Sequence, residues 1–274
     1  MSQLRISSWN VEGRLSETKT IKRAKPNDIV KAIKSLNSDI LVLLEAHSEN
    51  TIDELATLGQ LKDMGYYVYN APYSDDLKTR PDAYTSQLSM VLLSKFKIDK
   101  FDIYKLGDIR NCFTATIDNK IRIIGVHLDD RSEENRIKQV TDLSKIINKS
   151  NIKTVVLGDL NTMHGEDIWP SKFLRSRPIR WLAQIILPII STRAVEMARG
   201  EALKLLEVKT GLIDADINHR PTVTPKSRDL EWLPSIRLMQ IDHIYISKNI
   251  GVSNFAIGKD KGSDHRAISA TISF

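Results

Sequence analysis

The chain has 274 residues, of which 41% are hydrophobic and 27% are charged, and its formal net charge at pH 7 is +6. These values are typical of a globular protein that is long enough to bury a full core. The single cysteine, Cys112, excludes an internal disulfide. No apolar run reaches the roughly 20 residues of a membrane-spanning helix.

The N-terminal half of the chain predicts alternating strands and helices. The first residues lack a signal-peptide core, so we expect a cytoplasmic protein. Residues 4–9 alternate apolar and polar side chains, which predicts a strand with one buried face. A helix capped by Asn27 or Asp28 follows, and then residues 39–44 form a continuous apolar strand covered on both faces. A second helix is expected from near Thr51.

The rest of the chain continues with strands and one clear helix. Strands are expected at residues 66–69 and 88–93, around a polar loop (72–87) whose Arg80 and Tyr84 are candidates to line a site. Further strands follow at 98–104, 113–117, 121–126, 154–157, 241–246, 252–257 and 267–272. Ser132-Glu133-Glu134 opens a helix with acids in its positive first turn. This order fits two sheets packed face to face with helices outside.

Polar residues of ligand type flank the buried strands. Asp264 and His265 open the last apolar stretch, Asn10 and Glu45 close two earlier strands, and Asp159 and Asn161 follow a third. The sites of open α/β sheets lie just past the carboxyl ends of their strands. Each short motif is equally compatible with a simple turn, and only the ordered set favours a reaction centre.

That ordered set, with His127 and Asp242, resembles the endonuclease/exonuclease/phosphatase superfamily of metal-dependent phosphoesterases from Trp9 to Ile268. The resemblance implies an α/β fold, namely a four-layer α/β sandwich in which two mixed β-sheets pack face to face with helices outside. It implies a single domain over residues 1–274 with a basic and apolar insertion at about 165–210. It also implies that Asn10 and Glu45 hold a metal. The family commonly has glutamine before this glutamate, whereas Leu44 stands here.

The predicted metal site is rich in oxygen. A carboxylate at the end of an apolar strand is costly to bury unpaired, so Glu45 needs either a cation or an arginine partner. Mg²⁺ or Mn²⁺ suits Glu45 with Asn10 and Asp264, because both ions prefer oxygen ligands.

Asp159 and Asn161 stand two residues apart, so their side chains point the same way in an extended segment. Asp159 can activate the attacking water, and the Asn161 amide can donate to the phosphate.

The histidines are expected to handle the phosphate and its leaving group. His265 should contact the scissile phosphate, with Asp242 orienting its other nitrogen and favouring the cationic form. His127 is a candidate general acid or phosphate donor, or else a structural histidine near a strand end. Arg110 lies where branches of the family keep a phosphate-facing arginine. The remaining histidines receive no role, because isolated histidines are more often structural or surface residues: His47, His164, His219 and His243.

Residues 169–200 concentrate nearly all of the positive excess. The segment has one anion, Glu196, against six cations: Lys172, Arg175, Arg177, Arg180, Arg193 and Arg199. Arg177 and Arg180 are candidate substrate-binding residues, and Trp169, Phe173 and Trp181 add aromatic surface. The segment could clamp nucleic acid, face a lipid surface, or simply pack on the core as a helical excursion.

The leading hypothesis is a Mg²⁺-dependent phosphoesterase that hydrolyses phosphodiester bonds in nucleic acid, as a nuclease or DNA-end-processing enzyme. The alternative is a phosphatase or phosphodiesterase acting on inositol phosphates or phospholipid head groups, with an anionic membrane surface as partner. A third hypothesis is a binding protein on an inactive enzyme scaffold. No obligate protein partner is inferred.

Overall fold

The computed structural model describes residues 3–12, 26–47, 52–73, 88–164, 188–224, 237–259 and 261–274. The elements in chain order are β1 (Gln3–Asn10), α1 (Pro26–Leu36), β2 (Ile40–His47), α2 (Ile52–Asp63), β3 (Tyr67–Pro72), β4 (Leu88–Ser94), β5 (Lys100–Leu106), β6 (Arg110–Ile117), β7 (Ile121–His127), α3 (Glu133–Asn148), β8 (Lys153–Asp159), α6 (Pro188–Met197), α7 (Glu201–Thr210), β9 (Ile213–Asp214), β10 (Asp242–Ile246), β11 (Gly251–Ile257) and β12 (Ile268–Ser273).

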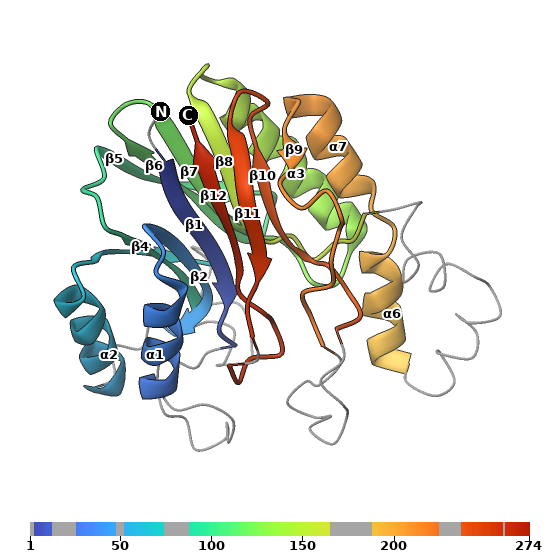
Figure 1. Ribbon diagram of the computed structural model, residues 1–274. Helices are drawn as coiled ribbons and strands as arrows, with labels where there is room; N and C mark the ends of the chain where they lie inside the picture. The colour runs from blue at the N-terminus through green and yellow to red at the C-terminus, as the bar shows by residue number, and fades with distance from the viewer. Residues whose placement is uncertain are drawn as a thin grey trace.

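The strands form two mixed six-stranded sheets (Figure 1). One sheet has the order β11-β12-β1-β2-β4-β3, and the other has the order β5-β6-β7-β8-β10-β9. Each sheet contains one parallel pair, β1 with β2 and β7 with β8, among antiparallel neighbours. Both termini lie at the same end of the first sheet, because β1 and β12 pair antiparallel along their whole length.

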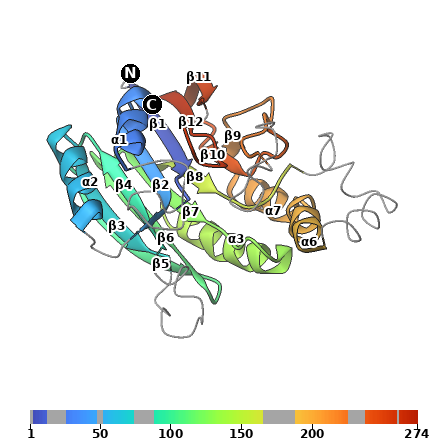
Figure 2. The same ribbon diagram turned by 90° about the horizontal axis from the view of Figure 1, so that it is seen from below.

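The two sheets pack face to face and carry helices on their outer faces, as Figure 2 shows from below. The core between the sheets is built from side chains such as Ile6, Val42 and Leu157. α1 and α2 cover the first sheet over a cluster that includes Trp9, and α3 and α7 cover the second over a cluster that includes Tyr245. The predicted four-layer α/β sandwich is confirmed.

β1 is buried on both faces rather than on one, which corrects the sequence prediction for residues 4–9. The strand lies inside its sheet, between β12 and β2, so its polar side chains are covered as well. Ser7 satisfies its hydroxyl inside the protein through Ser38 at 2.6 Å and Ser269 at 2.8 Å. The two serines of this strand are therefore buried rather than in contact with water, although the Ser8 hydroxyl has no hydrogen-bond partner among the described residues.

Most predicted elements are present within a few residues of their expected bounds, and Ser132 caps α3 by accepting from the N–H of Asn135. Sequence reasoning did not identify α6, α7 or β9 as separate elements. The apolar and basic character of residues 169–200 obscured the helical periodicity of α6. Arg80 and Tyr84 of the polar loop lie outside the described residues. No helix in the described part of the chain is both long and apolar enough to cross a membrane.

Gly158, one residue before Asp159, allows β7 and β8 to approach closely. Its φ is +151°, and a Cβ atom at this position would stand 1.9 Å from the carbonyl oxygen of Val126. That oxygen belongs to the backbone of the neighbouring strand and cannot move without breaking the register. A side chain here would therefore shift the strand end that carries Asp159.

We predict that Gly158→Ala lowers the free energy of unfolding by roughly 2 kcal/mol or more, because the new methyl group adds both strain and a backbone clash. Chemical denaturation measures this change. The matched control is Gly59→Ala in α2, where a Cβ meets no atom within 4 Å. That control should raise stability by about 0.5–1 kcal/mol, since alanine favours a helix interior. Equal stability of the two variants would contradict the close-approach argument.

Candidate active site

The predicted site residues from both sheets meet at one end of the sandwich. Asn10 ends β1 and Glu45 lies near the end of β2, which runs parallel to it. In the second sheet, His127 ends β7 directly opposite Asp159 at the end of β8, and Asp242 begins the antiparallel β10 opposite Asp159 as well. Parallel strand ends and the start of an antiparallel neighbour share one edge, so the chain order brings these residues together.

Asn10 joins the two sheets at this edge. Its side-chain nitrogen lies 3.0 Å from Glu45 Oε1 and 3.3 Å from Asp159 Oδ2, while its side-chain oxygen accepts from the N–H of Glu12. A positive φ of 51° and an irregular pairing with β4 turn Glu45 out of the regular strand register. The Asn10 amide thus holds the carboxylates of Glu45 and Asp159, one from each sheet, close to each other.

His127 is fixed in one neutral form by Tyr73. The Tyr73 hydroxyl oxygen accepts from the backbone N–H of Glu45 at 3.0 Å and the same hydroxyl is hydrogen-bonded to His127 Nδ1. Because that oxygen accepts the hydrogen bond from Glu45, its own O–H is placed to donate to Nδ1, and this direction corresponds to the tautomer with the ring proton on Nε2. Nε2 points to Asp159 Oδ2 at 3.6 Å and to Glu45 Oε1 at 4.0 Å. Burial lowers the pKa of His127, which favours this neutral donor.

His265 is held in the opposite, cationic form. Its Nδ1 donates to Asp242 at 2.9 Å, and Thr222 donates to the same carboxylate at 2.7 Å. Its Nε2 faces Asp159 Oδ2 at 3.7 Å and Asp264 Oδ1 at 4.0 Å. Burial opposes the charge, but Asp242 and Asp159 outweigh it and raise the pKa of His265 well above the usual histidine value. The predicted contact with Asp242 is present.

Asp159 stands between the two imidazoles and is buried, with 2% of its surface exposed. Burial raises the pKa of Asp159 to about 6, although His265 and His127 act against the shift. Its other oxygen accepts from the backbone N–H of Asn161 at 2.9 Å. A carboxylate with a pKa near neutrality can exchange a proton with water at physiological pH.

Asn161 and Asp264 extend the centre on either side. Asn161 has a positive φ of 50°, and its side-chain amide donates to the carbonyl oxygen of Leu128 at 3.0 Å, which ties the segment after β8 to that after β7. The Ser263 hydroxyl donates to the carbonyl oxygen of Asn10 at 2.7 Å and lies 3.5 Å from Asp264 Oδ1. Asn161 thus borders the Asp159 carboxylate, and Asp264 borders the His265 ring at 4.0 Å.

Arg110 lies at the edge of the same centre. Its guanidinium carbon stands 5.2 Å from the centre of the Tyr73 ring, and its Nη2 lies 3.4 Å from Asp130 Oδ1. Arg193 also approaches Asp130, at 3.6 Å. The other two residues predicted to bind substrate, Arg177 and Arg180, lie outside the described residues.

Two residues of this network were not singled out by sequence reasoning. Tyr73 was assigned only to the start of a polar loop, and Thr222 was not considered. Neither carries a recognisable signal in one sequence, because each acts through a contact with a histidine or carboxylate far away in the chain. Their roles become visible only when the hydrogen bonds of His127 and Asp242 are traced.

The donor set suits a hard divalent cation. Glu45 and Asp159 place carboxylate oxygens around one amide, and burial raises the pKa of both carboxyl groups. Oxygens of Asp159 and Asp242 and a ring nitrogen of His265 also lie within 4.8 Å of one another. Such a concentration of buried carboxylates is costly unless a cation neutralises it. Asn10 would become an oxygen ligand by rotating its amide, which now presents nitrogen to both carboxylates.

We predict that Tyr73→Phe shifts the tautomer of His127, because the hydroxyl that donates to Nδ1 is lost. Nitrogen chemical shifts of the imidazole measure the populations of the two tautomers. The change should keep the edge-to-face contact between the ring at position 73 and the His127 ring, so the fold should remain stable. The matched control is Tyr69→Phe, whose hydroxyl accepts from the N–H of Ile98 outside this centre. An unchanged His127 tautomer in the Tyr73 variant would contradict the assignment.

The comparisons with known proteins agree with this geometry. The sequence profile of the Endonuclease/Exonuclease/phosphatase family matches residues 7–265, which include every residue of the centre described above. A search among curated proteins found no sequence match.

Solved structures share the fold over nearly the whole chain. The 3′ phosphatase NExo from Neisseria, bound to a product DNA hairpin, matches with a TM-score of 0.65 at 15% identity, covering 99% of this chain and 100% of that chain. Truncated TDP2 from Caenorhabditis elegans gives 0.60 at 17% identity, with 99% and 98% covered. An endonuclease/exonuclease/phosphatase from Beutenbergia cavernae gives 0.66 at 16%, with 99% and 72% covered. At these identities the likeness establishes the fold.

Proposed function

The chain belongs to the endonuclease/exonuclease/phosphatase family of hydrolytic phosphoesterases, and we propose that it hydrolyses phosphate ester bonds in nucleic acid with Mg²⁺ or Mn²⁺ as cofactor. The observation that carries this proposal is the position of Asp159. One buried carboxylate lies 3.6 Å from His127 Nε2 and 3.7 Å from His265 Nε2, and the surroundings lower the pKa of His127 and raise the pKa of His265. Hydrolysis at a phosphate needs one group that accepts a proton and another that donates one, and side chains with different pKa values can divide these two tasks.

Each side chain has a distinct task in the proposed reaction. Asp159 accepts a proton from the attacking water, for which its pKa of about 6 is suited. Cationic His265 donates Nε2–H to a phosphate oxygen as that oxygen gains negative charge. Neutral His127 offers Nε2–H to another phosphate oxygen or to the leaving oxygen. Asp242 and Thr222 keep His265 oriented.

Mg²⁺ or Mn²⁺, held by Glu45 with Asn10 and Asp264, would neutralise charge on the phosphate and stabilise the leaving oxygen. Glu45 has the exposure this task needs, since 23% of its side chain is accessible while Asp159 is almost fully covered. The ligand set is rich in oxygen, which favours these ions over zinc.

Nucleic acid is the substrate class that the surroundings favour. The net charge of +6 suits a polyanion, and Arg110 adds a guanidinium beside the centre. Two similar structures are a 3′ phosphatase bound to product DNA and TDP2. We propose that Arg177 and Arg180 contribute further phosphate contacts.

We predict activity on oligonucleotides that a chelator abolishes and that Mg²⁺ or Mn²⁺ restores. The measurement is a panel of oligonucleotides, inositol phosphates and phospholipids, each assayed with chelator and with added metal. Activity confined to inositol phosphates or phospholipids would replace the proposed substrate class. Full activity in chelator would overturn the metal requirement.

Glu45→Gln should weaken Mg²⁺ binding, because the amide lacks the negative charge that holds the ion. Activity should recover only at higher Mg²⁺ concentration. The matched control is Glu201→Gln at the start of α7, where the carboxylate pairs with Arg199 on the surface. That control should show the wild-type Mg²⁺ dependence.

We predict that Asp159→Asn and His265→Ala each lower kcat by roughly 10²-fold or more, since proton abstraction and charge stabilisation each contribute about that much. The double variant should lose less than the product of the two factors, because both groups act on one transition state. The control is Asp102→Asn on β5, whose carboxylate pairs with Lys100 at the surface. Near-wild-type kcat in either single variant would refute its role.

A further inference from the structure

A second group of polar side chains lies on the other side of β10. Three histidines, His164, His219 and His243, face one carboxylate oxygen of Asp214. We call these four residues the histidine cluster. Successive residues of a strand point to opposite faces of the sheet. Asp242 therefore faces the catalytic centre and His243 faces the histidine cluster, so the two groups are distinct.

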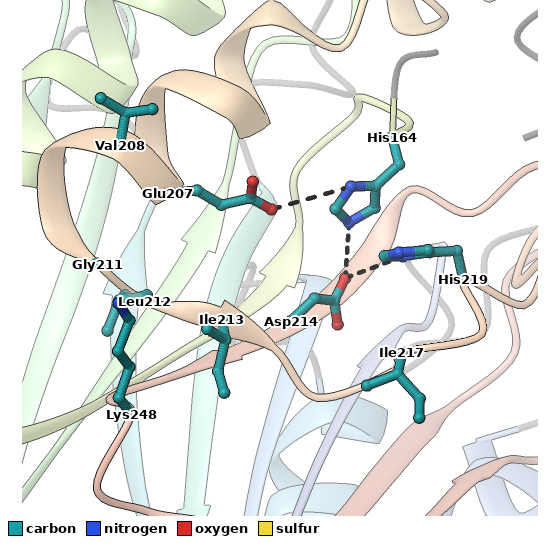
Figure 3. A pocket seen from close by; sticks show the side chains of 10 residues that line it. All are labelled: His164, Glu207, Val208, Gly211, Leu212, Ile213, Asp214, Ile217, His219 and Lys248. Atoms are coloured by element: carbon teal, nitrogen blue, oxygen red, sulfur yellow. Dashed lines mark hydrogen bonds and ion pairs between the residues drawn. The ribbon is translucent and has the colours of Figure 1, made fainter. Parts of the chain in front are cut away.

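The histidine cluster opens into a cavity of about 570 Å³ (Figure 3). Figure 3 shows the His164 ring between Glu207 and Asp214, with His219 on the other side of the Asp214 carboxylate. The cavity gives solvent and small ions access to the cluster.

The donor atoms are spaced as a metal would require. Asp214 Oδ2 lies 2.8 Å from His243 Nδ1, 3.1 Å from His164 Nε2 and 3.9 Å from His219 Nδ1. Ligands around a tetrahedral zinc ion, each about 2.0–2.1 Å from the metal, stand roughly 3.3 Å from one another. The separations of Asp214 from His243 and His164 are therefore close to the spacing that the ion would impose, and these three donors all lie within 4.8 Å of one another.

The outer nitrogen of His243 is hydrogen-bonded as in a metal-bound histidine, and the outer nitrogen of His164 has a carboxylate nearby. His243 Nε2 donates to the carbonyl oxygen of Thr162 at 3.0 Å, which leaves Nδ1 to face Asp214. The Nδ1 of His164 faces Glu207 Oε1 at 3.9 Å, and Tyr245 holds that carboxylate by donating to it at 2.9 Å. A backbone carbonyl or carboxylate behind the ring is the usual arrangement that orients a histidine toward a metal.

His219 lies beside these three donors. Its Nδ1 is shielded from solvent, makes no hydrogen bond within the described residues, and lies 3.9 Å from the shared carboxylate oxygen. It stands outside the set of donors that lie within 4.8 Å of one another, which is His164, Asp214 and His243, so it would become a ligand only after its ring turned.

We propose that the histidine cluster binds one zinc ion through His164, Asp214 and His243. Two imidazoles with a single carboxylate favour zinc over Mg²⁺, which prefers an all-oxygen set. The ion would join three segments that are distant in sequence: the chain after β8, β9, and β10. It would fix the strand that carries Asp242 on its opposite face.

The test measures zinc binding and does not depend on hydrolysis. Metal-stripped protein is titrated with Zn²⁺ in competition with a chromophoric chelator, with excess Mg²⁺ present to occupy the oxygen-rich centre. We expect one equivalent of Zn²⁺ in the wild type and in Glu45→Gln, and Zn²⁺ should raise the Tm of both. Co²⁺ in the same place should give the visible absorption of a tetrahedral site. Absence of this equivalent, or an octahedral Co²⁺ spectrum, would overturn the proposal.

Variants assign the ligands. His164→Ala should raise the Kd for Zn²⁺ by at least about 100-fold, and Glu207→Gln, which acts behind this ligand, by roughly 10-fold or more. His164 is suited to this test because it lines the cavity and 17% of its side chain is exposed, so its loss should not unfold the protein. The matched control is Ile217→Ala, where an 82% exposed side chain lines the same cavity but offers no donor. Wild-type zinc affinity in His164→Ala would refute the site.

Discussion

At one end of the sandwich, the two sheets contact each other through charged and polar side chains, and each sheet supplies partners for the charged groups of the other. Glu45 comes from the first sheet and Asp159 and Asp242 from the second, and an isolated buried carboxylate is costly. The Asn10 amide and the His265 imidazolium reach across from the first sheet and offset this cost. Removing one member of such a buried pair destabilises a protein by roughly 3–5 kcal/mol, because the partner charge is left uncompensated. Together with the apolar core between the sheets, the contacts of the proposed site therefore help to fix the position of one sheet relative to the other.

A second buried ion pair supports the rim of the site. Arg136 donates to Glu133 at 2.7 Å with both side chains fully buried, and it also donates to the carbonyl oxygen of Asp129. Glu133 accepts from the N–H of Ala202 at the start of α7. These bonds fix the turn after β7, whose Asp130 lies against Arg110. The helices outside the second sheet thus help to place the Arg110 guanidinium at the edge of the site.

β10 links the two polar groups of the protein. Asp242 orients His265 on one face of the strand, and His243 belongs to the histidine cluster on the other. Opposite this pair, Gly158 has no side chain, so β7, β8 and β10 can lie close together without a clash. A metal at the histidine cluster would stiffen the strand on which the orientation of His265 depends. The orientation of His265 on one face of β10 and the histidine cluster on the other face are thus linked through the backbone of Asp242 and His243.

The sequence by itself determined the order of the main elements, the family, and the chemical types of the residues at the strand ends. Hydrophobic periodicity and strand-end motifs are local properties, so Asn10, Glu45, Asp159 and His265 could be identified from their neighbours in the chain. Tertiary structure alone decided the partners that set protonation, such as Tyr73 for His127 and Thr222 for Asp242. It also brought together His164, His219 and His243, which look like unrelated surface histidines in the sequence. Side chains separated by many residues acquire a common function only through strand pairing and sheet packing, which a single sequence does not encode in any local pattern.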